Sequence, residues 1–190
     1  HRRARPAQPR RPRPLALAVD PRLAVPPGGE QAFVLVKTDR AGRQRELLRQ
    51  IGLSFTIDPA DVDETVLSGE SPETYAVRVA LEKAQVASKR AGKGVVIAAD
   101  TIVVLNSTIL GKPADARDAE RMLGMLSEKM HRVITGLVLR DVATGKTVTR
   151  TAVTKVWFKS LSPGEIRSYV ATGEPLDKAG AYAIQEKGAL

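Results

Sequence analysis

The chain has 190 residues, 43% of them hydrophobic, and no cysteine. This length supports one domain with a real core, and the lack of cysteine excludes disulfides, thiolate metal sites and thiol nucleophiles. The formal net charge is +9, but six arginines lie within residues 1–14, so the rest of the chain is close to neutral and its charge does not indicate nucleic-acid binding.

Residues 1–31 are rich in arginine, proline and alanine. This composition predicts a disordered tail, followed by one folded domain over residues 32–190. A solvated tail is favoured over a nucleic-acid-binding arm. No apolar run approaches the roughly 20 residues of a membrane span, and the stretch PLALAV is too short and too close to prolines for a secretory signal. We therefore expect a cytoplasmic protein with neither a membrane nor a nucleic-acid partner.

The folded part opens with a predicted strand over residues 32–37. A short helix over 43–52 follows and ends at Gly52, and a second strand covers 53–57. An acidic loop over 58–64 comes next.

Ser71 is a good N-cap for a long helix that runs to Arg90, because a proline and a glutamate follow it. Lys83, in the middle of this helix, is more typical of a helix surface. The apolar run over 95–99 predicts a central strand covered on both faces. The buried side of the helix is expected to consist of Tyr75, Val79, Ala80, Ala84 and Ala87.

Later elements are a helix over 115–130, two strands over 131–140 and 147–161 that form a hairpin, and a helix with a capping box at Ser162 that ends at Gly173. Helices and strands are mixed and do not strictly alternate. The sequence therefore predicts an α/β or α+β protein with a mixed sheet.

Asp100 interrupts the apolar and threonine-rich run VVIAADTIVV. A buried carboxylate without partners is costly. At the end of a central strand, a pocket can hold such a group and raise its pKa toward that of a general base. An aspartate that caps a turn through its side chain is an equally good interpretation.

Further candidates are weaker. Asp61, Asp63 and Glu64 could supply oxygen ligands for Mg²⁺, although a solvated acidic loop is the favoured interpretation. Lys112 stands on a rigid Gly-Lys-Pro turn and could bind a phosphate. Arg43 lies near a helix N-terminus, a natural anion site, but is equally typical of a helix surface.

Near the end of the chain, Asp177 and Lys178 could pair with each other, and Gln185 could read the edge of a base. The two histidines, His1 and His131, are too few for a histidine metal cluster. No Walker A loop or GxGxxG motif is present in the sequence. The remaining carboxylates, lysines and arginines are typical of a phosphate-handling site that uses a metal.

Six segments, taken in order, resemble the Maf family of nucleotide pyrophosphatases. The resemblance implies an α/β fold with a mixed twisted sheet flanked by helices, and two lobes with a central cleft. It also implies hydrolysis of a nucleoside triphosphate to monophosphate and pyrophosphate, with a divalent metal, Mg²⁺ or Mn²⁺. The segments are RELLRQIGLSFTIDPADVDE, ALEKA, AADTIVVL, ILGKPADARDAERML, HRVITGL and GEPLDKAGAYAIQ.

By this resemblance, Asp100 would be the general base and Glu64 a metal ligand, with Lys83 and Lys112 binding the triphosphate. The segments ADT and KAGAYAIQ are similar to the subgroup that prefers dTTP and UTP, and a homodimer is implied. The positions associated with choice of the base are Arg43, Thr101 and Gln185.

Two features depart from the family pattern. DRAGRQRELL stands where the family has a serine-rich SxSPRR turn, so both serines are absent from the phosphate loop over Asp39–Gln44. The chain also ends at Leu190, before the family's last strand and helix, and the domain therefore looks truncated. These features leave an alternative open, a truncated or degenerate relative that binds nucleotides with weak catalysis.

Overall fold

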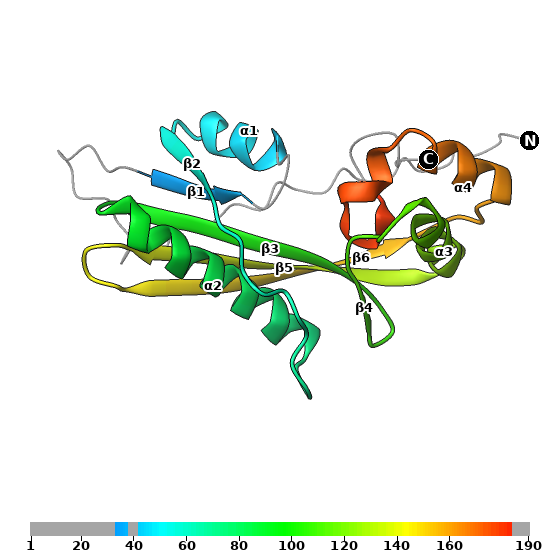
Figure 1. Ribbon diagram of the computed structural model, residues 1–190, viewed down its shortest axis with the longest axis horizontal. Helices are drawn as coiled ribbons and strands as arrows, with labels where there is room; N and C mark the ends of the chain where they lie inside the picture. Colours follow the sequence, from blue (N-terminus) through cyan, green and yellow to red (C-terminus); the bar gives the residue numbers. More distant parts are fainter. Residues whose placement is uncertain (1–32, 38–41, 184–190) are drawn as a thin grey trace, which may run out of the picture. The chain divides into compact units, whose positions relative to one another are not determined.

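Figure 1 shows the computed structural model, which describes residues 33–37 and 42–183. The chain divides into two units, residues 1–31 and 32–190, and all of the described residues belong to the second. The expected disordered tail lies outside the described residues.

The described ranges contain six strands, four α-helices and two short 3-10 helices. In chain order these are β1 (Phe33–Lys37), α1 (Gly42–Gln50), β2 (Phe55–Pro59), α2 (Pro72–Ala91), β3 (Val95–Leu105), β4 (Thr108–Leu110), α3 (Ala116–Leu126), β5 (Met130–Asp141), β6 (Thr147–Trp157), α4 (Pro163–Val170), η2 (Glu174–Asp177) and η3 (Ala179–Ala181).

All six strands form one mixed sheet in the order β2-β1-β3-β5-β6, with β4 paired to β3 outside this path. β1 is parallel to β2 and to β3, whereas β4 and β5 are antiparallel to β3. The predicted hairpin is the antiparallel pair of β5 and β6. The expected α/β class, with a mixed sheet flanked by helices, is confirmed.

One edge of the central strand β3 is shared by two partners. β1 pairs with its first part, from Val95 to Ala98, and β4 pairs with its last part, from Val103 to Leu105. The other edge is paired with β5 from Val95 to Val104. The first edge is therefore interrupted, among the described strands, over residues 99–102.

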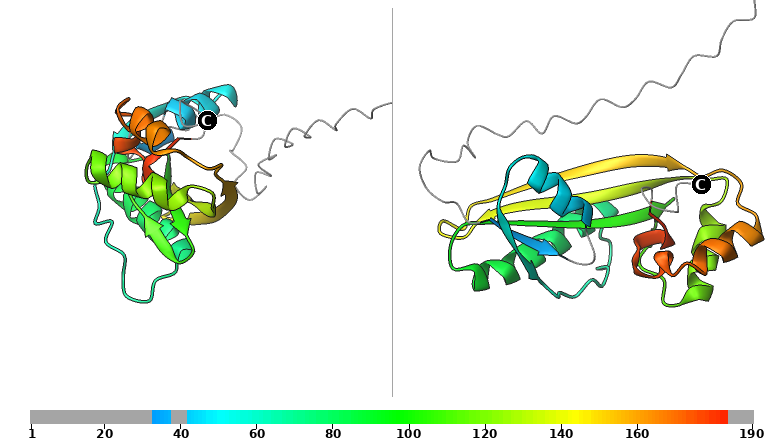
Figure 2. Two further views of the ribbon diagram at one scale, coloured as in Figure 1. Left: turned by 90° about the vertical axis from the view of Figure 1, so that its right-hand side faces the viewer. Right: turned by 90° about the horizontal axis from the view of Figure 1, so that it is seen from above.

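The helices cover both faces of the sheet. Because side chains alternate along a strand, Val96 and Ala98 of β3 lie on one face, where they form a core with α2 residues such as Ala84. Val103 and Leu105 lie on the opposite face and pack with α3, α4 and η3. Figure 2 shows the long strands that connect these helical regions.

α2 lies very close to β5 at Gly136. A Cβ added there would lie 2.4 Å from the carbonyl oxygen of Ala76 in α2. Only glycine lets the helix backbone approach the strand this closely. Gly136 pairs with Asp100 across the sheet, so this contact sets the position of α2 over the middle of β3.

The structure corrects several predicted boundaries. β3 continues without a break through Asp100 to Leu105, so this residue neither ends a strand nor caps a turn. β2 starts at Phe55 and takes in Asp58 and Pro59, because β2 lies at the edge of the sheet, where proline is tolerated. The three-residue strand β4 was not predicted.

α3 and α4 are shorter than expected. α3 ends at Leu126, and Glu128 adopts a left-handed conformation with φ of 59°, which turns the chain into β5. α4 ends at Val170, three residues before Gly173. The N-termini of α2 and α4 form as expected, since Ser71 accepts a hydrogen bond from the backbone of Thr74 and the capping box at Ser162 is present.

Candidate functional site

The interrupted edge of β3 presents Asp100. Its side chain lies on the sheet face that α2 covers, because residues two apart along a strand share a face, and Ala98 and Ile102 pack on that face. Asp100 is 9% exposed. By the register of the pair, β1 ends next to this interruption, one residue after Val36 pairs with Ala98. Ligand sites in α/β sheets form at the carboxyl ends of strands, so the position suits a binding site.

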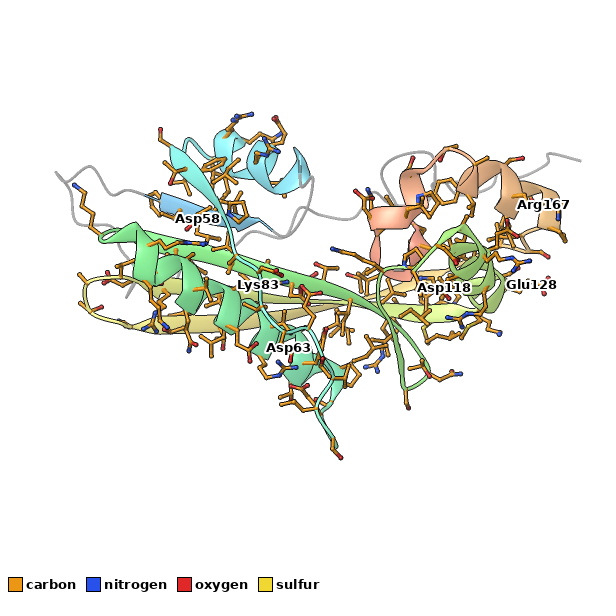
Figure 3. The ribbon with its side chains drawn as sticks, in the orientation of Figure 1. Asp58, Asp63, Lys83, Asp118, Glu128 and Arg167 are labelled. Atoms are coloured by element: carbon orange, nitrogen blue, oxygen red, sulfur yellow. The ribbon has the colours of Figure 1, made fainter. Side chains whose placement is uncertain are left out.

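Lys83 of α2 connects two carboxylates at this site. Its Nζ donates hydrogen bonds of 2.7 Å to Asp100 Oδ1 and 2.7 Å to Glu64 Oε1. The lysine is 1% exposed, so its assignment to the helix surface was wrong. Figure 3 labels Lys83 on α2 and Asp63 on the segment that follows β2. Three residues that the resemblance singled out therefore lie in direct contact.

Burial raises the pKa of Asp100, because desolvation disfavours the charged carboxylate. The ammonium of Lys83 opposes this effect, the carboxylate of Glu64 adds to it, and Lys112 also lowers the pKa of Asp100 through its charge. Burial and the charges of Asp100 and Glu64 raise the pKa of Tyr75 to about 12. The site thus holds a carboxylate whose affinity for a proton is increased.

The predicted acidic ligands separate in the structure. Glu64 joins Lys83, whereas Asp61 is exposed. Asp63 is also exposed, and its Oδ1 accepts a hydrogen bond of 2.9 Å from the backbone of Thr65. The interpretation as a solvated loop fits Asp61 and Asp63, and Glu64 is the residue of this segment that reaches the site.

The described residues include no group of three or more His, Cys, Asp or Glu that could hold a metal ion. Mg²⁺ usually needs only one or two protein carboxylates, because substrate phosphates and water complete its shell. Lys83 contacts Oδ1 of Asp100 and Oε1 of Glu64, which leaves the second oxygen of each as a candidate ligand. The donor set therefore fits a metal that binds together with a phosphorylated substrate.

Thr101 lies on the sheet face opposite Asp100 and is exposed. Its hydroxyl lies 2.9 Å from the hydroxyl of Thr135 in β5. At this position the sheet thus offers the carboxylate of Asp100 on one face and a pair of hydroxyls on the other.

Several predicted site residues cannot be placed. Gln185 lies outside the described residues, and so does the phosphate loop from Asp39 to Ala41. For Arg43 the structure describes only the backbone, in the first turn of α1. The expected pair near the C-terminus is present, since Lys178 donates a hydrogen bond of 2.8 Å to Asp177.

Sequence reasoning missed three polar residues around the site. Tyr75 was expected only as a core residue, although its hydroxyl donates a hydrogen bond of 2.7 Å to the carbonyl of Glu64. Arg78 binds the same segment, and Thr135 pairs with Thr101. The spacing of Tyr75 and Arg78 places them one helical turn apart, but no local pattern connects either to Glu64.

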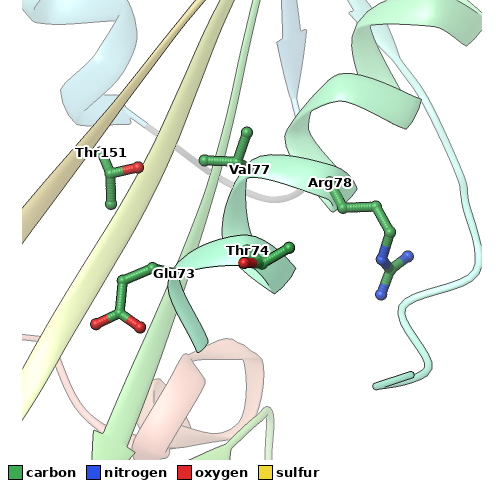
Figure 4. Close-up of a pocket in the computed structure, with 5 residues that line it drawn as sticks. All are labelled: Glu73, Thr74, Val77, Arg78 and Thr151. Carbon is green, nitrogen blue, oxygen red and sulfur yellow. The ribbon is translucent and has the colours of Figure 1, made fainter. Parts of the chain in front are cut away.

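A hollow of about 410 Å³ lies between α2 and β6. Figure 4 shows its lining, Glu73, Thr74, Val77, Arg78 and Thr151. Asp100, Lys83 and Glu64 are not part of this lining, and we do not assign the hollow to the candidate site.

The fold and the site define an α/β protein with a carboxylate–lysine cluster at an interrupted strand edge. Residues 41–190 match the family model described as Maf-like protein. The chain therefore belongs to the Maf-like protein family.

Curated relatives cover most of the chain. The dTTP/UTP pyrophosphatase of Anaeromyxobacter dehalogenans (strain 2CP-C) is 54% identical over 157 residues, which cover 81% of this chain and 78% of the relative. That of Myxococcus xanthus (strain DK1622) is 48% identical over 155 residues, 82% of this chain and 78% of the relative. Among solved structures, a HAM1 protein from Coxiella burnetii matches with a TM-score of 0.48 and 18% identity, over 67% of this chain and 72% of that one.

Proposed function

We propose that this protein is a nucleoside triphosphate pyrophosphatase that hydrolyses dTTP and UTP to the monophosphate and pyrophosphate. The relatives named dTTP/UTP pyrophosphatase support the reaction and the substrates. The observation that carries the proposal in the structure is the contact of Glu64, Lys83 and Asp100 at the interrupted edge of β3.

Asp100 acts as the general base in this proposal. A water molecule attacks the α-phosphorus and forms a bond to it. The bond from that phosphorus to the oxygen that bridges to the β-phosphoryl group breaks, and pyrophosphate leaves. The attacking water gives its proton to Asp100 Oδ2, since Oδ1 already accepts from Lys83. Burial raises the pKa of Asp100, which increases its ability to accept that proton.

The positive charges serve the phosphates. Lys83 pairs with one oxygen of the Glu64 carboxylate and one oxygen of the Asp100 carboxylate. This pairing reduces the repulsion between the two carboxylates and an anionic substrate. Lys112 is exposed and binds the triphosphate. Its charge acts on Asp100, which supports a position at the same site.

A divalent metal, Mg²⁺ or Mn²⁺, completes the proposed site. The second carboxylate oxygen of Glu64 would hold it, and phosphate oxygens of the substrate would complete its shell. When bound, the metal neutralises charge that develops on the phosphate oxygens.

In this proposal, selectivity for the nucleobase of the substrate is determined by Thr101, Arg43 and Gln185. The hydroxyl of Thr101 can donate to or accept from a base edge, which supports its role. The remaining two are assigned by their positions in the family motifs. We also propose a cytoplasmic homodimer, to be tested by fractionation and by light scattering.

The proposal is tested by incubating the folded protein with dTTP, UTP, CTP and 7-methyl-GTP, with Mg²⁺ or Mn²⁺. Release of pyrophosphate is expected from dTTP and UTP and less from the others. No release from any nucleotide would contradict the proposal. Thermal stabilisation by UTP without hydrolysis would favour the alternative, a weakly catalytic relative that binds nucleotides.

Replacement of the proposed base provides a second test. Asp100→Asn keeps the size of the side chain and removes its ability to accept a proton, so hydrolysis of UTP is expected to fall at least about 100-fold. Circular dichroism and UTP-dependent thermal shift check that the variant folds and still binds. Near-normal turnover in a folded Asp100→Asn protein would exclude Asp100 as the base.

A further inference from the structure

The segment that carries Glu64 has little packing of its own. Residues 60–71 connect β2 to α2, and most of their side chains are exposed. A loop with few buried contacts opens easily. The position of Glu64 against Lys83 therefore depends on polar contacts that hold this backbone in place.

Two neighbouring residues of α2 hold successive carbonyls of the segment. The hydroxyl of Tyr75 donates a hydrogen bond of 2.7 Å to the carbonyl of Glu64. Nη2 of Arg78 donates one of 2.9 Å to the carbonyl of Thr65. The guanidinium of Arg78 also lies over the Tyr75 ring, 5.3 Å from its centroid, so the two side chains support each other.

Arg78 connects this point to the far end of the segment. Its Nε and Nη2 donate to Glu70 Oε1 and Oε2 at 2.7 and 2.9 Å, and Glu70 in turn accepts 3.1 Å from the backbone of Leu67. The Glu70 side chain is only 5% exposed. Nη1 of Arg78 donates to Glu82, 3.1 Å away, which fixes the guanidinium from the helix side.

Figure 4 shows the direction of the Arg78 side chain. Arg78 extends from α2 on the side away from Glu73, toward the segment that follows β2. A bidentate contact to one carboxylate and a third contact to a carbonyl need the planar guanidinium, and a lysine ammonium cannot make all three with the same geometry.

We propose that Arg78 is a positioning residue, which holds the segment over residues 64–70 so that the carboxylate of Glu64 stays against Lys83. Arg78 touches no reacting group. It acts through the carbonyl of Thr65 and through Glu70. This inference rests on the proposed function, in which Glu64 holds the metal.

The test compares Arg78→Gln and Arg78→Lys with the wild type. Without the bidentate contact the Glu64 carboxylate samples other positions, so both variants are expected to lose about 10-fold in kcat, in the range seen for groups that orient metal ligands. The KM for UTP is expected to change much less, because Lys112 and Thr101 are untouched. Mn²⁺ binding, measured by electron paramagnetic resonance with a non-hydrolysable nucleotide, is expected to weaken by a similar factor.

Arg90→Gln is the matched control. Arg90 lies on the same helix and also binds a carboxylate and a backbone carbonyl, those of Asp58 and Pro59, but it does not hold Glu64. Its loss is expected to leave kcat and Mn²⁺ binding at wild-type values. Melting temperatures of all variants show how much general stability each has lost.

Wild-type kcat and Mn²⁺ affinity in Arg78→Gln would overturn the inference, and so would an equal loss in Arg90→Gln. If Arg78→Gln does not fold, Arg78→Lys decides, since it keeps the charge. A wild-type protein that hydrolyses no nucleotide contradicts the proposed function and not this inference. In that case Mn²⁺ binding, weakened by Arg78→Gln and not by Arg90→Gln, supports it.

Discussion

Lys83 is the residue on which the candidate site depends. A buried ammonium is costly unless it is paired, and the two contacts of 2.7 Å to Asp100 and Glu64 supply that pairing. The three charges form one unit in which each carboxylate shares the same cation. The effect of removing Lys83 therefore falls mainly on Asp100, the more deeply buried carboxylate.

Lys83→Met tests this unit. Methionine fills most of the space but leaves the buried carboxylate of Asp100 unpaired, and breaking a buried pair costs about 3 kcal/mol. At pH 7 the free energy of unfolding is expected to fall by roughly that amount, measured by urea denaturation. Hydrolysis of UTP is expected to fall as well, since repulsion between the carboxylates and the triphosphate is no longer offset.

This loss of stability depends on pH. Burial raises the pKa of Asp100 above its ordinary value of 3.8, and Lys83 opposes that rise. Without Lys83 the folded-state pKa is higher still, so the folded variant takes up a proton more readily than its unfolded chain. The variant's deficit in free energy of unfolding is therefore largest above the raised pKa of Asp100 in the variant. The deficit shrinks as the pH falls through that pKa toward 3.8. A difference that stays constant from pH 7 down to pH 3.8 would contradict this explanation.

The burial of Lys83 could have been predicted. It follows Val79 by four residues and precedes Ala87 by four, and so it continues the buried stripe of the helix. Its partners could not, because Asp100 is 17 residues away and Glu64 is 19 residues away along the chain. Periodicity determines the face of a helix, but only packing brings distant carboxylates to it.

Among the elements, α2 organises the site. It contributes Lys83 to the cluster, holds the Glu64 segment through Tyr75 and Arg78, and packs directly on the sheet. Its backbone passes so close to Gly136 that no side chain fits between them. The distance from helix to sheet at this point decides whether Lys83 reaches Asp100.

Gly136→Ala tests this contact. The added methyl group would lie 2.4 Å from the Ala76 carbonyl, so the helix must move outward, at a cost of about 1–3 kcal/mol. Hydrolysis of UTP is expected to fall together with the melting temperature. Both are measured on the same preparation.

Gly124→Ala in α3 is the matched control. Nothing lies within 4 Å of a Cβ at this position, and alanine favours a helix interior over glycine by about 1 kcal/mol. This variant is expected to be at least as stable as wild type, with unchanged hydrolysis. Equal stability of both alanine variants would show that the α2 backbone leaves room for a side chain at position 136.

In the whole described unit, two helical regions pack on opposite faces of the long central strands. The region formed by α3, α4 and η3 is joined to β5 by a buried pair, His131 and Tyr182, whose Nε2 and hydroxyl lie 2.6 Å apart. Phe158 packs edge-on against both rings. This aromatic cluster ties the segment after η3 to the sheet.

The pair predicts a loss of stability in mild acid. Burial lowers the pKa of His131 below its ordinary 6.5, so the unfolded chain binds a proton more readily than the folded one. The stability that neutral, buried His131 contributes is present above pH 6.5 and is lost as the pH falls below this value. Wild type is therefore expected to lose free energy of unfolding between pH 7.5 and pH 5.5.

His131→Phe isolates this effect. The variant leaves the Tyr182 hydroxyl unpaired and is expected to be about 1–2 kcal/mol less stable at pH 7.5. The variant has no group at position 131 that can gain a proton, whereas wild type loses stability in acid. The difference in free energy of unfolding between the two proteins is therefore expected to be smaller at pH 5.5. Urea denaturation at both pH values measures this. Asp100 is present in both proteins, so its contribution cancels in the comparison. A deficit that widens in acid would contradict the assignment.

The sequence by itself determined the mixed α/β class, the caps at Ser71 and Ser162, the buried side of α2 and the hairpin of β5 and β6. These features depend on local propensity and on the alternation of polar and apolar residues, which act over a few residues. The ordered family motifs also indicated Asp100, Glu64 and Lys83 as members of one site.

The tertiary structure decided what those residues can do. It showed that Asp100 lies within a continuous strand, at the place where, among the described strands, β1 and β4 leave the edge of β3 unpaired. It also buried Lys83 between two carboxylates and brought Arg78 to the segment that carries Glu64. These relations join residues far apart in the chain, and the energy of such contacts depends on burial and distance, which no local pattern contains.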